Sequence, residues 1–112
     1  MGEILNDVGQ KVLVYEGDVS GRIEAYATVR LIEVDSPEKP PRRVCFIDCF
    51  AVAESSRRKG IGTELFEAVK AFGREKGCDC VQLGVSAGNA DAVSFYEKMG
   101  LKPRIVQMES KL

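Results

Sequence analysis

The sequence has 112 residues, which is enough for one small domain and too few for a second. Sixteen lysines and arginines against 17 aspartates and glutamates give a formal net charge of −1, which argues against nucleic-acid binding through bulk positive charge. The chain contains no histidine, which excludes Ser-His-Asp and Cys-His catalysis and removes the commonest ligand of zinc and non-haem iron. We therefore expect one domain over residues 1–112 that binds no nucleic acid and no metal, with any anion site confined to a local patch.

Cysteine spacing and hydropathy indicate the compartment. No apolar run approaches the roughly 20 residues needed to cross a bilayer, and the N-terminus lacks the pattern of a signal peptide. Cys78 and Cys80 form C-x-C rather than the C-x-x-C of metal sites, and Cys45 and Cys49 lie in an apolar run. The sequence therefore predicts a cytoplasmic protein, not associated with a membrane, with four free and mostly buried thiols.

The first half of the chain has the patterns of β-strands. Residues 11–16 form a short β-branched run, and residues 17–21 have the composition of a turn. Apolar and polar residues alternate over 22–34, which predicts a long half-buried strand. Residues 35–41 contain three prolines and are expected to form a loop outside the sheet. Residues 43–52 are apolar on both faces apart from one aspartate, which is typical of a central strand.

The second half alternates helices and strands. A helical pattern opens at Gly60 and ends at Gly77, and Cys80–Val85 is predicted to be a short buried strand. Asn89 is expected to cap a second helix, and Arg104–Lys111 to form a final strand. The predicted order β-β-β-α-β-α-β indicates a mixed α/β fold, with antiparallel strands first and a β-α-β crossover later.

The segment from Val52 to Thr63 carries the clearest chemical signal. It joins a buried strand to a helix through two glycines and three consecutive cations. Free amides at a helix start attract anions, and glycine lets a phosphate approach the backbone closely. The segment is neither a P-loop nor G-x-G-x-x-G, because Leu65 stands where the third glycine belongs. It predicts a phosphate-bearing ligand, and the alternative is a solvated basic turn.

Two motifs, one in residues 57–62 and one in residues 89–101, resemble those of the GNAT family of N-acetyltransferases. Residues 57–62 match the acetyl-coenzyme A signature [Q/R]-x-x-G-x-[G/A], and residues 89–101 are similar to the family's N-x-x-A-x-x-F-Y-x-x-x-G-F helix, with Leu101 for Phe. The resemblance covers about residues 11–112 and implies a GNAT-like acyl-CoA N-acyltransferase fold with acetyl-coenzyme A as co-substrate.

The resemblance also implies where coenzyme A binds. Backbone groups at the end of the central strand would pair with the pantetheine arm as an added strand would. Amides at the helix start would hold the pyrophosphate, and the preceding cations would offset its charge. Asn89 corresponds to the family's asparagine near the cofactor, and it also fits an N-cap worth about 1 kcal/mol. The implied cofactor-binding residues are Phe50, Ala51, Val52, Arg57, Arg58, Lys59, Gly60, Ile61, Gly62, Thr63 and Asn89.

The implied catalytic residues are Tyr96 and Asp48. Tyr96 matches the tyrosine that protonates the departing thiolate in many relatives, and it also fits an ordinary core position on a helix. Asp48 stands where many relatives have a glutamate as general base. Because aspartate is one methylene shorter, a water relay is favoured over direct proton transfer, and the alternative is a hydrogen-bonded structural carboxylate.

The resemblance implies direct acetyl transfer to a primary amine in a ternary complex, the acceptor being a small molecule or a peptide. Relatives begin with a strand and two helices that form much of the acceptor wall, whereas residues 1–10 alone precede the first predicted strand here. The acceptor site would therefore be open or completed by a second subunit, and an exposed sheet edge predicts a homodimer. The alternatives are a non-catalytic module that binds coenzyme A and, less favoured, a nucleotide-binding domain.

Overall fold

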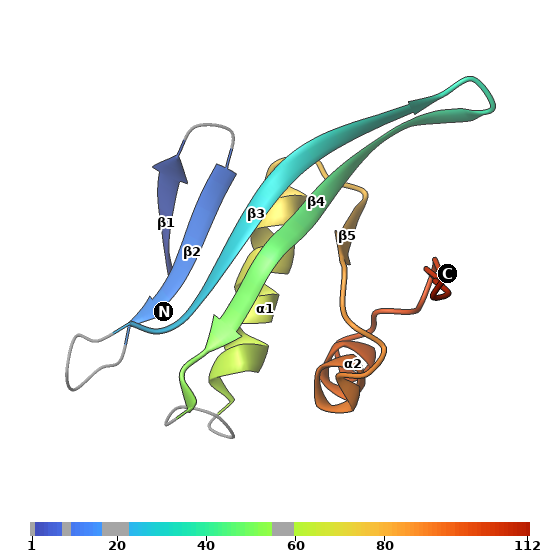
Figure 1. The fold of residues 1–112 in the computed structure, drawn as a ribbon. Coiled ribbons are helices and arrows are strands. Elements are labelled where there is room, and N and C mark those ends of the chain that lie inside the picture. The colour runs from blue at the N-terminus through green and yellow to red at the C-terminus, as the bar shows by residue number, and fades with distance from the viewer. Residues whose placement is uncertain (1, 8–9, 17–22, 55–59) are drawn as a thin grey trace.

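The structure is a computed structural model that describes residues 2–7, 10–16, 23–54 and 60–112 (Figure 1). The predicted turn at residues 17–21 lies outside the described part. The elements within it, in chain order, are β1 (Gly2–Asp7), β2 (Gln10–Glu16), β3 (Ile23–Ser36), β4 (Lys39–Val52), α1 (Ile61–Glu75), β5 (Cys80–Leu83) and α2 (Ala90–Lys98).

The strands form one mixed sheet in the order β1-β2-β3-β4-β5. The first four strands are antiparallel to their neighbours, and β5 runs parallel to β4 after the crossover through α1. The predicted mixed α/β class is thereby confirmed. The element order differs at both ends, since β1 was not expected and the C-terminal strand is missing from the described sheet.

The hairpin between β3 and β4 corrects the prediction of a loop over residues 35–41. The two strands continue to a tight turn, and β4 includes Pro40 and Pro41. The pairing shifts register beside these prolines, between Val34 and Ser36. This end of β4 has β3 as its one neighbour in the described sheet, because the pairing with β5 begins at Val44. An irregular, one-sided ladder tolerates residues without an amide proton.

The core lies between the sheet and α1, which covers one face of the strands (Figure 1). The apolar positions of α1 recur at helical spacing and are buried, as predicted. Gly73 allows close packing, because a Cβ at this position would lie 3.3 Å from the Cβ of Cys45. The buried cluster comprises Leu13, Ala25, Ala27, Val29, Cys45 and Ile47 from the strands and Ile61, Leu65, Phe66, Val69 and Phe72 from α1.

The C-terminal segment is not the strand that the sequence predicts over residues 104–111. Residues 101–112 form neither helix nor strand, and Ile105, Val106 and Met108 are 70%, 80% and 87% exposed. A strand is stable only when a neighbour accepts its backbone hydrogen bonds, and the pattern of residues within a segment does not supply that neighbour. The prediction of a final strand over residues 104–111 is therefore wrong.

The four cysteines are free, as predicted, but their burial differs from the expectation. Cys45 is buried, Cys78 and Cys80 are half-buried, and Cys49 is exposed. Among the described residues, no three Cys, Asp or Glu side chains are grouped so that they could hold a metal ion. None of the described helices has the length and apolar character required to span a membrane.

Candidate functional site

β4 has one extra residue, Asp48, relative to the strand β3 that pairs with it. Ile47 lies opposite Val29 and Cys49 opposite Thr28, so three consecutive residues of β4 face two of β3. This is a β-bulge, which bends a strand and re-aims its side chains.

The bulge reverses the inward positions along β4. Before it, Cys45 and Ile47 point into the core, and after it Phe50 and Val52 pack against the core. A strand without the extra residue would turn residues 49 and 51 inward instead. The bulge therefore brings the ring of Phe50 to the α1 side of the sheet, at the end of β4 where coenzyme A is predicted.

The pairing between β4 and β5 ends next to the bulge. The parallel ladder runs from Val44 opposite Cys80 to Ile47 opposite Leu83. Beyond it β4 continues beside β3 to Val52, while the chain after β5 turns away toward α2 (Figure 1). The two strands therefore part at the residues, Phe50 and Ala51, for which the sequence predicts pairing with an extended ligand.

The start of α1 lies close to the point where the strands part. Gly60 has φ of 78°, in the left-handed region that favours glycine, and its carbonyl accepts a hydrogen bond of 3.0 Å from the amide of Glu64. No side chain caps this helix among the described residues. The amides of Ile61, Gly62 and Thr63 are in the first turn, where a helix has no backbone acceptor for them. This is the group of donors predicted to hold a pyrophosphate.

Gly62 lies where α1 packs against α2 and β4, and a methyl group would fit there at ordinary contact distances. A Cβ there would lie 3.5 Å from the ring of Phe95 and 3.6 Å from Val52, so α1 approaches α2 and β4 closely at this residue. The predicted cations Arg57, Arg58 and Lys59 lie outside the described residues.

Tyr96 belongs to a cluster of four aromatic rings contributed by β4, α1 and α2. The centroid of its ring is 6.1 Å from Phe50, 6.2 Å from Phe66 and 5.4 Å from Phe95. Burial raises the pKa of the Tyr96 phenol, and the charge of Cys49 raises it further. The phenol is therefore protonated at neutral pH, as a proton donor must be.

Asp48 accepts a hydrogen bond from Arg30 on the neighbouring strand. The Nε–Oδ2 distance is 2.7 Å, and the guanidinium carbon of Arg30 lies 5.3 Å from the centroid of the Phe46 ring. The hydrogen bond to Asp48 raises the pKa of Arg30, and the carboxylate charge adds to this rise. An ion pair of this kind is expected if the carboxylate of Asp48 has a structural role. Arg30 was not predicted, because it is one of several polar residues that alternate along β3 and is 18 residues from its partner.

Asn89 caps α2, as predicted. Its Oδ1 accepts a hydrogen bond of 3.2 Å from the amide of Ala92. The cap fixes the start of the helix that carries Phe95 and Tyr96. It accounts for Asn89 structurally, and its contact with a cofactor stays a prediction.

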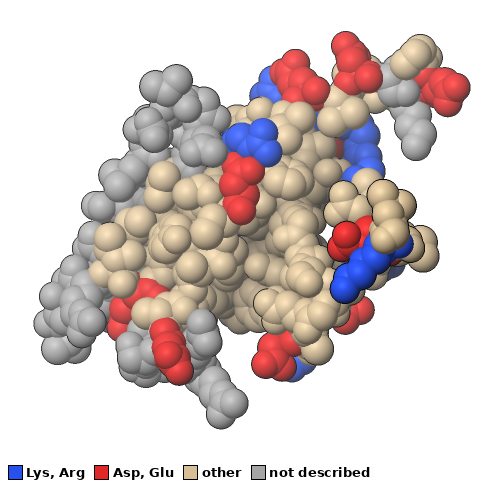
Figure 2. Space-filling view, viewed as in Figure 1, with Lys and Arg blue, Asp and Glu red and all other residues tan. Residues whose placement is uncertain are grey.

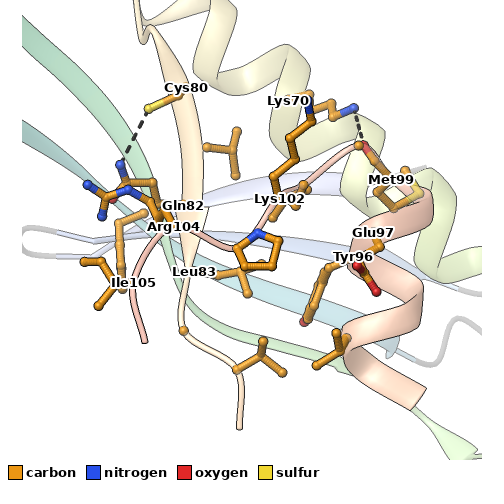
Figure 3. Close-up of a pocket in the computed structure, with 18 of the residues that line it drawn as sticks. Lys70, Cys80, Gln82, Leu83, Tyr96, Glu97, Met99, Lys102, Arg104 and Ile105 are labelled. Carbon is orange, nitrogen blue, oxygen red and sulfur yellow. Dashed lines mark hydrogen bonds between the residues drawn. The ribbon is translucent and has the colours of Figure 1, made fainter. Parts of the chain in front are cut away.

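A groove runs between β5, α2 and the C-terminal segment (Figure 3). Tyr96, Leu83 and Ile105 are among its lining residues. Lys70 of α1 donates a hydrogen bond of 3.0 Å to the carbonyl of Met99, which ties the end of α2 to α1. Figure 2 shows the surface hollowed between the sheet and the C-terminal segment. The predicted general acid is therefore one of the residues that line this groove.

Comparisons with known proteins agree with this geometry. The sequence profile described as "Acetyltransferase (GNAT) family" matches residues 4–101. The curated "Uncharacterized N-acetyltransferase YdgE" of Bacillus subtilis is 32% identical over 72 residues, which are 64% of this chain and 46% of that protein. The chain thus spans about half the length of this relative.

Solved structures share the fold. A mutant of the BH1408 protein from Bacillus halodurans has a TM-score of 0.87 and 30% identity, covering 93% of this chain and 67% of that one. An acetyltransferase of Trypanosoma brucei has a TM-score of 0.73 and 29% identity, covering 93% of this chain and 70% of that one.

Proposed function

Because the chain belongs to the GNAT family of acetyltransferases, we propose that it transfers the acetyl group of acetyl-coenzyme A to a primary amine of a small molecule or peptide. The observation that carries the proposal is the parting of β4 from β5 beside the first turn of α1. An extended arm ending in a pyrophosphate needs both features, a strand edge and a group of amides. A nucleotide alone would need only the amides.

The strand edge and the helix start each support one part of coenzyme A. Phe50 and Ala51 continue β4 past the last β5 pair, so their backbone suits the amide-bearing pantetheine arm. The first-turn amides of α1, at Ile61–Thr63, suit the pyrophosphate. Arg57, Arg58 and Lys59 precede them in the sequence and would offset the remaining phosphate charge.

The reaction proceeds by direct transfer in a ternary complex. The amine nitrogen attacks the thioester carbonyl, the carbon–sulfur bond breaks, and the acetyl group ends on nitrogen. Asp48 or a water takes the proton lost by the amine, and Tyr96 gives the departing thiolate its phenolic proton. Positioning of the two substrates supplies most of the acceleration.

Thermal unfolding with coenzyme A tests the cofactor assignment. Ligand at 100 times its dissociation constant stabilises the native state by about 2.7 kcal/mol, which raises the melting temperature of a domain this small by at least about 10 °C. ATP and NAD should give a much smaller rise. Gly62→Val should abolish the rise by placing a branched side chain at the first-turn amides, and Gly62→Ala, whose Cβ meets its neighbours at 3.5 Å or more, is the matched control. No rise in the wild-type protein would contradict the assignment.

Release of free thiol from acetyl-coenzyme A, in the presence of a panel of amines, tests the transferase activity. A protein that is stabilised by coenzyme A and never releases thiol would be the non-catalytic binding module instead. The two measurements therefore separate cofactor binding from catalysis.

The pH dependence of kcat/KM tests the role of Asp48. If Asp48 takes the proton, Asp48→Asn should weaken the limb that rises toward alkaline pH, because an amide cannot accept the proton. Arg30→Gln is the companion variant, since it removes the ion pair and keeps the carboxylate. A profile that Asp48→Asn leaves unchanged would make the carboxylate structural.

The proposed assembly is a homodimer in the cytoplasm. β1 and β5 are the two outer strands of the described sheet, and an exposed strand edge tends to pair with another chain. Light scattering on the purified protein measures the mass, and a monomer at high concentration would contradict the dimer.

A further inference from the structure

The helix α2 carries the predicted general acid, Tyr96, and is held in place by few interactions. None of its residues is fully buried. Its start is fixed by the Asn89 cap, and the rings of Phe95 and Tyr96 lie against rings of β4 and α1. Among the described residues, a single hydrogen bond joins this helix or its end to another element. The position of Tyr96 therefore depends on a small set of contacts.

That hydrogen bond comes from Lys70, near the middle of α1 (Figure 3). Its ammonium group donates to the carbonyl of Met99, the residue that ends α2, at 3.0 Å. The carbonyls of Tyr96 and Glu97, in the last turn, accept hydrogen bonds of 3.0 Å from backbone amides. A cation is favourable at this end of a helix, where the last carbonyls carry partial negative charge. Lys70 thus completes the cap of α2 from a different helix.

The ammonium group of Lys70 is itself held in place. Its Nζ lies 5.6 Å from the centroid of the Phe66 ring and 3.9 Å from a carboxylate oxygen of Glu67, both on the preceding turn of α1. The side chain is only 28% exposed. The ring of Phe66 is also the one whose centroid is 6.2 Å from that of Tyr96. Because residues four apart share a face of a helix, Lys70 and Phe66 support α2 from the same face of α1.

We propose that Lys70 is a positioning residue for the reaction. By holding the end of α2 against α1, it keeps the phenol of Tyr96, about one turn before Met99, where the departing thiolate takes its proton. This role rests on the proposed function. A displacement of about 1 Å in a catalytic group can lower a rate about 100-fold, so one hydrogen bond that restrains α2 matters more for kcat than for stability.

Lys70→Met tests the role by kinetics. Methionine keeps the apolar stem and the helix propensity of lysine and removes the donor and the charge. We expect kcat to fall about tenfold, with the KM for acetyl-coenzyme A nearly unchanged. Lys70→Arg keeps a cationic donor and should recover most of the loss. Lys76→Met is the matched control, because Lys76 also lies over a ring of α1, 5.8 Å from the Phe72 centroid, and donates no hydrogen bond to α2 in the described structure.

Combination with Tyr96→Phe separates positioning from a direct role. If Lys70 acts through the phenol, Lys70→Met should have little further effect on kcat once the phenol is absent. A loss of the same size in the Tyr96→Phe background would show that Lys70 acts on the substrates directly, and it would overturn the proposal. A wild-type kcat in Lys70→Met would overturn it too.

Titration of Tyr96 tests the placement of α2 without any measurement of activity. Burial raises the pKa of this phenol above its ordinary value of 10.0. If α2 moves away from α1 in Lys70→Met, water reaches the phenol and its pKa should fall. Loss of the ammonium group with α2 in place would instead raise the pKa, because a positive charge favours the phenolate. Nuclear magnetic resonance of tyrosine-labelled protein follows the titration, and Tyr96→Phe identifies the signal.

The titration also separates this proposal from the proposed function. An unchanged or raised pKa of Tyr96 in Lys70→Met would overturn the positioning role, whatever the activity of the wild-type protein. A lowered pKa in a protein that never releases thiol from acetyl-coenzyme A would support the placement of Tyr96 by Lys70 and contradict the proposed function alone.

Discussion

The two halves of β4 are built from similar apolar residues and have different neighbours. From Val44 to Ile47 the strand lies between β3 and β5, hydrogen-bonded into the sheet on both sides. After Asp48 it keeps β3 and leaves β5, and its inward side chain Phe50 stacks against rings of α1 and α2. The first half is held by sheet pairing together with core burial, and the second by pairing with β3 and by aromatic packing.

This difference explains why the candidate site lies where it does. A ligand that adds itself as a strand needs an available edge, which the first half of β4 does not have. The second half gains that edge because β5 ends, and the aromatic cluster takes over the support of the strand. Four experiments would break or sharpen this comparison.

Phe66→Ala should have the largest effect, because this ring is fully buried beneath the second half of β4. We expect the free energy of unfolding to fall by about 3–5 kcal/mol in urea denaturation. Phe72→Ala, on the same helix and 3% exposed, should cost a similar amount. Of these two variants, only Phe66→Ala should change the titration of Tyr96, because the ring of Phe66 belongs to the aromatic cluster around Tyr96. If the pKa of Tyr96 were the same in both variants, the aromatic packing at the second half of β4 would not be distinct from the core beside the first half.

Tyr96→Phe keeps the ring and removes the phenolic proton. If Tyr96 is the general acid, kcat should fall about 100-fold under conditions where chemistry limits the rate, with coenzyme A affinity nearly unchanged. A melting curve beside the rate excludes a change in stability. Full kcat in the variant would show that Tyr96 is not the general acid.

The free energy of unfolding at alkaline pH tests the burial of Cys45 in the first half of β4. Burial raises the pKa of Cys45 from 9.0 to about 11. As pH rises, the thiol of Cys45 therefore loses its proton in the unfolded chain before it does so in the folded chain. The contribution of the buried thiol to stability is complete below pH 9 and is lost as pH rises from 9 through 11. We expect a loss of about 2 kcal/mol from Cys45 in the free energy of unfolding over this interval. Cys45→Ala should remove this part of the loss, whereas Cys49→Ser, at an exposed position, should retain it. Equal slopes in all three proteins would contradict the burial of Cys45.

Asn89→Ala should have the smallest effect. Loss of the hydrogen bond to the amide of Ala92 should lower the free energy of unfolding by about 1 kcal/mol. Asn89→Ser keeps an acceptor at the cap and should recover most of it. If coenzyme A affinity falls in the alanine variant and not in the serine variant, the cap acts by positioning α2. Loss of affinity in both would show that the amide side chain contacts the cofactor.

Local pattern was sufficient to predict much of the fold and the candidate site. Alternation along β3, helical spacing in α1 and the cap at Asn89 are set by neighbouring residues, and all are found in the structure. The pair of Arg30 and Asp48 depends on the register of two long strands and the bulge between them, which neither strand encodes alone. The C-terminal segment shows the same limit, since its pattern predicts a strand and the described sheet provides no neighbour for it.

The bulge at Asp48 also has a consequence for how relatives should be aligned. Because the bulge adds one residue, the side chains that point inward are at odd-numbered positions before Asp48 and at even-numbered positions after it. In a relative that lacks the extra residue, residues aligned without a gap would point to the same face as in this chain before Asp48. After Asp48 they would point to the opposite face. An alignment without a gap would then pair Cys49 with residues equivalent to Phe50, and a one-residue gap at Asp48 corrects it.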